Sequence, residues 1–306
     1  TVTQTYFVNV YHTLPVISLV TDPDELYSET DGIFTMGDNV DKSKIPFKTP
    51  VYRVYGKVPR PGYVEYYETD GTQVLSQGME FGLIGQYSLD MPQKSLKVKA
   101  KAAYGAKTFA ASLFDDRPFT EYKSFVLRNS GNDQVWSRLN DAVQSRLIDK
   151  LNTTVIHQAW KPVVVYINGV YWGQYNLRER VDRYFIAQHE GLSLDQADNM
   201  DVLEANSKVS WGSNKEYKEM IAKVKTLSPG KNAEDLKYIT DRIDVDNYFD
   251  YMAIEWFFGN SDSGNIRYYK LKGEGQKWKW IAYDLDYGLF KSQFDSPTSY
   301  LDPKGA

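Results

Sequence analysis

The sequence predicts an α+β fold in which a β-rich N-terminal part is followed by a mixed α/β C-terminal part. Over residues 1–125, short apolar or alternating runs are separated by turn residues, which is the pattern of strands. From about residue 133 a helical period appears, with Leu139, Val143 and Leu147 at four-residue spacing. The dipeptide Asn168-Gly169 lies between two strand-like runs and indicates a hairpin.

The strands expected in the N-terminal part each have a local signal. Residues 14–20 are an apolar run that ends at a turn-like Thr-Asp-Pro-Asp segment. Residues 62–68 alternate, and the turn Thr69-Asp70-Gly71 should lead them into a second strand. Residues 94–101 alternate lysine with apolar side chains, as an exposed strand does. Residues 125–128 form one more apolar run, which predicts another strand.

The C-terminal part combines helices with two hairpins. We expect a helix over residues 136–151, the Asn168-Gly169 hairpin, and a helix over residues 178–190 that ends at Gly191. Residues 213–228 and 232–258 should be mostly helical, with a break at Ser228-Pro229-Gly230. A short hairpin then closes the chain. The approximate boundary between the two parts is residue 130, giving lobes of 1–130 and 131–306.

Composition limits the function classes. With 42% apolar and 15% aromatic residues among 306, the chain can bury a substantial core. The net charge of −4 gives no electrostatic case for binding nucleic acid. No run of about 18 apolar residues exists, so no membrane span is expected, and the absence of cysteine excludes disulfides and thiolate metal sites. Because the chain begins at Thr1, we expect a segment excised from a longer, secreted protein.

Acidic and amide side chains flank the closing hairpin. Asp262 and Asn265 precede it, and Asp284 and Asp286 follow it, so folding the hairpin should bring the two groups together. Residues i and i+2 of a strand point the same way, so Asp284 and Asp286 should face one site. Such oxygen ligands suit Mg²⁺ or Mn²⁺. The simpler interpretations are an Asx turn at Asp262 and a solvated strand end whose carboxylates pair with basic side chains.

Lysines form a second candidate group. Lys97, Lys99 and Lys101 share one face of the expected strand, and Lys94 falls on the other. Positive side chains of this kind can hold phosphate oxygens. An edge strand that lysines protect against further pairing is the ordinary alternative.

Four separated blocks resemble the CotH family, the spore coat protein H type of atypical secretory kinase. They occur in the family's order and cover roughly residues 14–290. The blocks are Gln93-Lys94-Ser95-Leu96-Lys97-Val98, residues 125–131 (FVLRNSG), residues 166–179 (YINGVYWGQYNLRE), and Gly259-Asn260-Ser261-Asp262 followed by residues 280–288 (WIAYDLDYG).

The resemblance implies a two-lobed, atypical protein-kinase-like fold across residues 1–306. It also implies an extracytoplasmic enzyme that uses ATP with Mg²⁺ or Mn²⁺ to phosphorylate Ser or Thr of secreted or surface proteins. Carried over by motif, Asp262 matches the catalytic Asp, while Asn265, Asp284 and Asp286 cover the metal-ligand positions. The resemblance places Lys94, Lys97 and Lys99 at the phosphates and makes Glu179 an orienting carboxylate.

One departure keeps a second function open. Family members usually carry Gly-x-Ser-Arg before the Lys-Ser block, whereas this chain has Gln86-Tyr87-Ser88-Leu89. The missing arginine favours the alternative of a catalytically silent binding or adhesion module, which would use the 24 tyrosines for glycan or protein contact. A metal-dependent hydrolase is a third hypothesis, less favoured because no second cluster is evident to position an attacking water.

Overall fold

The computed structural model describes residues 3–37, 50–262, 264–291 and 293–301. The chain divides into two units, and each is treated by itself. The barrel unit comprises Thr1–Arg138 and Ala159–Arg180, and the C-terminal unit comprises Leu139–Gln158 and Val181–Ala306. Neither of these is one continuous stretch of sequence, because residues 159–180 return to the barrel unit.

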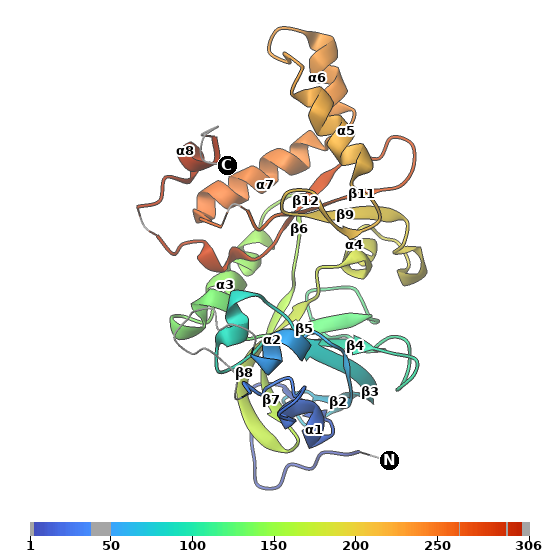
Figure 1. The fold of residues 1–306 in the computed structure, drawn as a ribbon, viewed down its shortest axis with the longest axis vertical. Helices are drawn as coiled ribbons and strands as arrows, with labels where there is room; N and C mark the ends of the chain where they lie inside the picture. Colours follow the sequence, from blue (N-terminus) through green and yellow to red (C-terminus); the bar gives the residue numbers. More distant parts are fainter. Residues whose placement is uncertain (1–2, 38–49, 263, 292, 302–306) are drawn as a thin grey trace. The chain divides into compact units, whose positions relative to one another are not determined.

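The barrel unit is built on a closed sheet of seven strands (Figure 1). Their order around the barrel is β1-β2-β3-β4-β5-β8-β7. All neighbours are antiparallel except β1 and β7, whose parallel pairing closes the sheet. The strands are β1 (Val16–Val20), β2 (Arg60–Tyr67), β3 (Gln73–Leu83), β4 (Leu96–Ala100), β5 (Ser124–Arg128), β7 (Trp160–Ile167) and β8 (Val170–Glu179).

Alternation along the strands fills the barrel. In β4, Leu96, Val98 and Ala100 are fully buried, whereas the lysines between them point away from the interior. Short helical segments cover the connections of this unit. They are α1 (Pro23–Tyr27), α2 (Val51–Tyr55), η1 (Tyr87–Asp90) and η2 (Gly131–Val135).

The C-terminal unit contains a five-stranded sheet with the order β10-β9-β11-β12-β6. Helix α7 packs against β12, and α8 packs against α7. The strands are β6 (Ile156–His157), β9 (Met200–Glu204), β10 (Lys208–Trp211), β11 (Arg267–Leu271) and β12 (Lys279–Ala282). The helices are α3 (Asn140–Ile148), α4 (Arg183–His189), η3 (Leu194–Gln196), α5 (Lys215–Val224), α6 (Ala233–Thr240), α7 (Val245–Phe258), η4 (Leu285–Tyr287) and α8 (Ser296–Leu301).

The expectation of a two-lobed kinase-like fold is wrong. The first unit is a closed barrel, and the second is a separate sheet with its own helices. The prediction failed because β1 pairs in parallel with β7, which places Val16 opposite Val164. No local sequence pattern indicates a parallel pairing between residues so far apart in the chain. The hairpin assigned to the mixed C-terminal part therefore completes the barrel.

Most local predictions are confirmed. Asn168-Gly169 joins β7 to β8, and both residues have positive φ, 49° and 77°, as a type I′ turn requires. The expected helix at residues 136–151 is shorter, and its apolar stripe of Leu139, Val143 and Leu147 is 40–45% exposed. Among the described residues, no helix is long and apolar enough to cross a membrane.

The barrel core should respond to a cavity in β8, which pairs with both β5 and β7. Leu177 is fully buried, so Leu177→Ala should lower the free energy of unfolding by about 2–5 kcal/mol. Val170→Ala on the same strand, where the side chain is 59% exposed, should change it by less than about 0.5 kcal/mol. Urea denaturation of both variants measures the difference, and equal losses would contradict this account of the barrel.

Candidate functional site

Helix α7 delivers the first candidate residues through a sharp turn. The helix ends at Gly259, whose φ of 59° is left-handed and suits glycine. The Asn260 amide then donates to the carbonyl of Glu255 in the last helical turn. Asp262 follows two residues later, so its position depends on how this helix ends.

The turn around Asp262 uses Asn260 as its Asx residue. The Asn260 Oδ1 accepts the Asp262 amide at 3.1 Å, and the Asp262 carbonyl accepts the Asn265 amide at 3.2 Å. The expected Asx turn therefore exists, but its side-chain acceptor is Asn260. This arrangement leaves the Asp262 carboxylate to interact with Asn265 instead.

Asp262, Asn265 and Asp284 are brought together and form a carboxylate–amide cluster. The Asn265 Nδ2 donates to Asp284 Oδ2 across the ends of the β11–β12 hairpin. Burial and, after it, the charge of Asp284 raise the pKa of Asp262, while a hydrogen bond with Asn265 opposes the shift. Two carboxylates therefore lie close enough to repel one another, and a cation would relieve that repulsion.

Asp286 lies in a different setting from Asp284. Strand β12 ends at Ala282, Asp284 is left-handed with φ 57°, and Asp286 is in η4 and 2% exposed. The expectation that both carboxylates extend from one strand is wrong, because the backbone is not extended here. The structure groups Asp284 with Asn265, and it buries Asp286 in the next turn.

Polar side chains of α3 hold this turn. Asn140 Nδ2 donates to the Asp286 carbonyl at 3.1 Å, Gln144 Nε2 donates to the Leu285 carbonyl at 2.8 Å, and Asp141 Oδ1 accepts the Leu285 amide at 3.2 Å. A Cβ at Gly288 would lie 2.1 Å from Gln144 Oε1, so any other residue there would force the Gln144 side chain to shift. The buried face of α3 is therefore partly polar, because it binds the main chain around Asp286.

The donor set fits Mg²⁺ or Mn²⁺ in kind. Carboxylate and amide oxygens are the ligands these ions prefer, and Asp262, Asn265 and Asp284 supply them. Among the described residues, no group of three or more His, Cys, Asp or Glu side chains is arranged to hold a metal ion. The cluster has two such carboxylates, and an amide is its third member.

Sequence reasoning missed Glu255. This side chain lies in the last turn of α7 and is 2% exposed. Burial raises its pKa to about 7, and Asn260, Tyr300 and Tyr251 act in the opposite direction and lower it. The signal was present in the sequence, because Glu255 is an acid within the apolar run Ile254-Glu255-Trp256-Phe257-Phe258. A buried acid in such a run needs polar partners.

In the barrel unit, Lys94 is engaged by the main chain. Its Nζ donates to the carbonyls of Leu89 at 2.6 Å and Met91 at 3.1 Å, and it lies 3.8 Å from the centre of the Tyr52 ring. Burial lowers the pKa of Lys94 to about 8. Lys94 therefore holds the loop that contains Leu89, the position where the family usually has arginine.

Lys97 and Lys99 lie on the outer face of β4. Lys99 Nζ pairs with Glu80 Oε1 at 3.2 Å. Burial, and then the charges of Arg180 and Lys99, lower the pKa of Lys97. Positive charges around Lys97 thus outweigh the opposing charge of Glu80, and an anion bound there would relieve their repulsion.

Glu179 is 2% exposed at the end of β8. Its Oε2 accepts the Ala159 amide at 2.8 Å and Arg117 Nε at 3.3 Å. Arg117 was not recognised from the sequence. The structure thus assigns Glu179 a cationic partner, Arg117, in its own unit.

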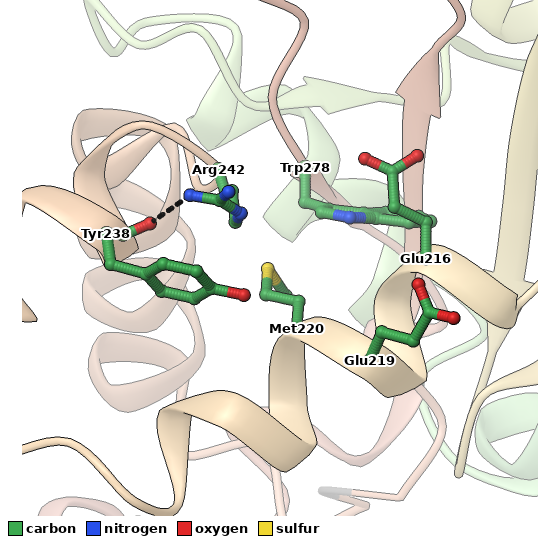
Figure 2. A pocket seen from close by; sticks show the side chains of 6 residues that line it. All are labelled: Glu216, Glu219, Met220, Tyr238, Arg242 and Trp278. Carbon is green, nitrogen blue, oxygen red and sulfur yellow. Dashed lines mark hydrogen bonds between the residues drawn. The ribbon is translucent and has the colours of Figure 1, made fainter.

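A cavity of about 220 Å³ lies elsewhere in the C-terminal unit (Figure 2). Figure 2 shows the carboxylates of Glu216 and Glu219 on one side and Tyr238 with Arg242 on the other. Met220 and Trp278, both buried, complete the lining. Arg242 stacks on the Tyr238 ring at 3.8 Å and donates to its carbonyl at 3.1 Å. None of the site residues predicted from the sequence lines this cavity.

Comparison with known proteins identifies a family. The family model described as CotH kinase protein matches residues 83–298, which is more than two thirds of the chain. No curated protein matches the sequence. The match to the family model includes every site residue predicted above.

The buried acid Glu255 should make stability fall with rising pH. Its pKa is about 7 in the folded state against an ordinary value of 4.5, so the folded state holds the proton more tightly between these values. The loss of stability that comes from ionising the buried carboxyl is absent below pH 4.5 and complete above about pH 7. The free energy of unfolding of the unmodified protein should therefore fall by about 2–3 kcal/mol between pH 5 and pH 8, and Glu255→Gln should remove this fall.

Urea denaturation at pH 5, 6, 7 and 8 measures this difference. The groups facing Glu255 are Tyr251, Tyr300, Asn260 and Asp262, and the two tyrosines have raised pKa values. Glu219→Gln, at an exposed position, is the matched control and should follow the unmodified protein. If the stability of Glu255→Gln depends on pH in the same way as that of the unmodified protein, the assignment of a raised pKa to Glu255 is wrong.

Proposed function

Because the chain belongs to the CotH kinase protein family, we propose that it is a metal-dependent ATP:protein phosphotransferase acting on Ser or Thr of secreted or surface proteins. The observation that carries the proposal is the carboxylate–amide cluster, in which Asn265 binds Asp284 and the charge of Asp284 acts on Asp262. Phosphoryl transfer needs these groups, a carboxylate at the incoming hydroxyl and oxygen ligands for a cation.

Asp262 is the residue we assign to the acceptor hydroxyl. Its carboxylate would orient that hydroxyl and accept its proton late in the transfer. The raised pKa of Asp262 suits this role, because it makes the carboxylate a better proton acceptor than an exposed aspartate. The turn through Asn260 fixes the main chain that carries it.

Asp284 and Asn265 are the residues we assign to the cation. A Mg²⁺ or Mn²⁺ held by these residues would supply positive charge to the phosphate oxygens. The Asn265–Asp284 hydrogen bond holds the two ligand side chains together in advance. Asp286 stays a predicted ligand, and the contacts that support the proposal are those of Asp284.

The lysines of β4 are assigned to the phosphates of ATP. Lys97 and Lys99 face outward on β4, and Lys97 also feels the charge of Arg180, so an anion would be attracted to Lys97 although Lys99 pairs with Glu80. Lys94 and Glu179 would act indirectly, since Lys94 holds the loop at Leu89 and Glu179 binds Arg117. The two groups of residues belong to different units, and each assignment rests on contacts within its own unit.

One observation favours the second candidate, a catalytically silent binding module. Leu89 stands where the family usually has arginine, and it is 2% exposed in the barrel core. The basic residue of the family pattern is therefore replaced by a core side chain. The two candidates differ in whether the protein binds nucleotide with a metal.

Substitution of either cluster carboxylate should abolish transfer. Asp262→Asn and Asp284→Asn keep the size of the side chain but remove its charge, so we expect Mn²⁺-dependent transfer from ATP to a protein acceptor to fall at least about 100-fold. Transfer of radiolabelled phosphate measures this, with circular dichroism to check folding. Asp246→Asn, at an exposed position of α7, should keep full activity. Full activity in both cluster variants would reject the assignment.

Nucleotide with metal should stabilise the protein. A ligand that binds only the folded state at about 100 times its Kd adds about 2.7 kcal/mol, so the Tm should rise with ATP and Mn²⁺ together. Asp284→Asn should lose this rise. An unchanged Tm at millimolar ATP and Mn²⁺ in the unmodified protein would favour the binding module.

A further inference from the structure

A chain of contacts leads from the buried acid Glu255 to the main chain of Asp262. The main-chain N–H of Asn260 donates to the Glu255 carbonyl at 3.1 Å, and the Asn260 Oδ1 accepts the Asp262 amide at 3.1 Å. Asn260 is 2% exposed, so this turn lies inside the protein. Asn260 therefore links the helix end at Glu255 to the position of the Asp262 backbone.

Helix α8 reaches the same point through Tyr300. The Tyr300 hydroxyl donates to Glu255 Oε2 at 3.1 Å, and it is also 3.1 Å from the Asn260 carbonyl. A second hydrogen bond, from Ser296 Oγ to the Trp256 carbonyl at 2.7 Å, joins the start of α8 to α7. Of these two attachments, only that of Tyr300 contacts Glu255 and Asn260.

The cost of the arrangement indicates that it does more than stabilise the helix end. A carboxylate that is 2% exposed carries a desolvation penalty that an apolar side chain of similar volume would not. Glu255 offsets part of it by accepting the hydrogen bond from the Tyr300 hydroxyl. The carboxylate thus ties the Tyr300 hydroxyl to the turn, because that hydroxyl also contacts the Asn260 carbonyl.

We propose that Glu255 and Tyr300 are positioning residues that act through Asn260 to hold the main chain of Asp262. This proposal rests on the proposed function, since it concerns the residue assigned to the acceptor hydroxyl. Helix α8 is then part of the site's support, although it contains none of the residues assigned to the reaction. A shift of the turn moves the Asp262 carboxylate, and displacement of about 1 Å can cost ~100-fold in rate.

The chain offers a matched pair of variants. Tyr300→Phe removes the hydroxyl that contacts Glu255 and Asn260, whereas Ser296→Ala removes the other hydrogen bond between α8 and α7. Both variants weaken the attachment of α8. If α8 has only a structural role, the two should behave alike. If Tyr300 is a positioning residue, only Tyr300→Phe should affect Asp262.

The first measurement is amide hydrogen exchange, which does not depend on activity. Loss of about 1 kcal/mol of hydrogen bonding should speed exchange at the Asp262 amide about fivefold in Tyr300→Phe and in Glu255→Gln. Ser296→Ala should leave that amide unchanged. Equal acceleration in Tyr300→Phe and Ser296→Ala, or none in Tyr300→Phe, would overturn the positioning role.

The second measurement is the transfer reaction itself. Tyr300→Phe and Glu255→Gln should lower kcat about tenfold or more with KM for ATP unchanged, and Ser296→Ala should keep both values. If the unmodified protein transfers no phosphate, the proposed function is rejected. The hydrogen-exchange data would still show whether Tyr300 and Glu255 position the main chain of Asp262. Active unmodified protein with full kcat in Tyr300→Phe would reject the positioning role and leave the proposed function intact.

Discussion

The candidate site depends on the contact between Asn265 and Asp284, which joins the two ends of the β11–β12 hairpin. Without the hairpin, these residues are 19 positions apart and unrelated. The antiparallel pairing of Arg267 with Ile281 sets the register, and the flanking side chains then meet. The repulsion between Asp262 and Asp284 is a consequence of this closure, and it is the reason we propose the cluster as a cation site.

Support for the cluster comes from residues that carry no charge in the proposed reaction. Asn140 and Gln144 of α3 hold the main chain after Asp284, and Asn260 holds the main chain before Asp262. These amides satisfy buried peptide groups that a turn would otherwise leave without partners. The same logic applies in the barrel unit, where Lys94 binds the carbonyls of Leu89 and Met91. In both units, side chains that bind main-chain groups shape the loops near the predicted site residues.

Local signals and long-range pairings differed in how well they could be predicted. The Asn168-Gly169 hairpin, the turn before β3 and helix α7 all follow from residues within one short window, and the structure confirms them. Closure of the barrel does not, because Val16 lies opposite Val164 and parallel strands need no shared turn. The stripe of Leu139, Val143 and Leu147 was equally ambiguous. Periodicity predicts a helix, but here the buried face is the one with Asp141 and Gln144.

The sequence by itself determined the family, the hairpins and the residue types of the candidate site, because motifs and turn residues are local properties. It also placed Asp262, Asn265 and Asp284 near one another, since a single short hairpin separates them. Only the tertiary structure decided that the first sheet closes into a barrel, that Asp286 is buried in η4, and that Glu255 and Tyr300 meet at Asn260. Those outcomes depend on pairings and desolvation among residues distant in the chain, for which one sequence carries no local signal.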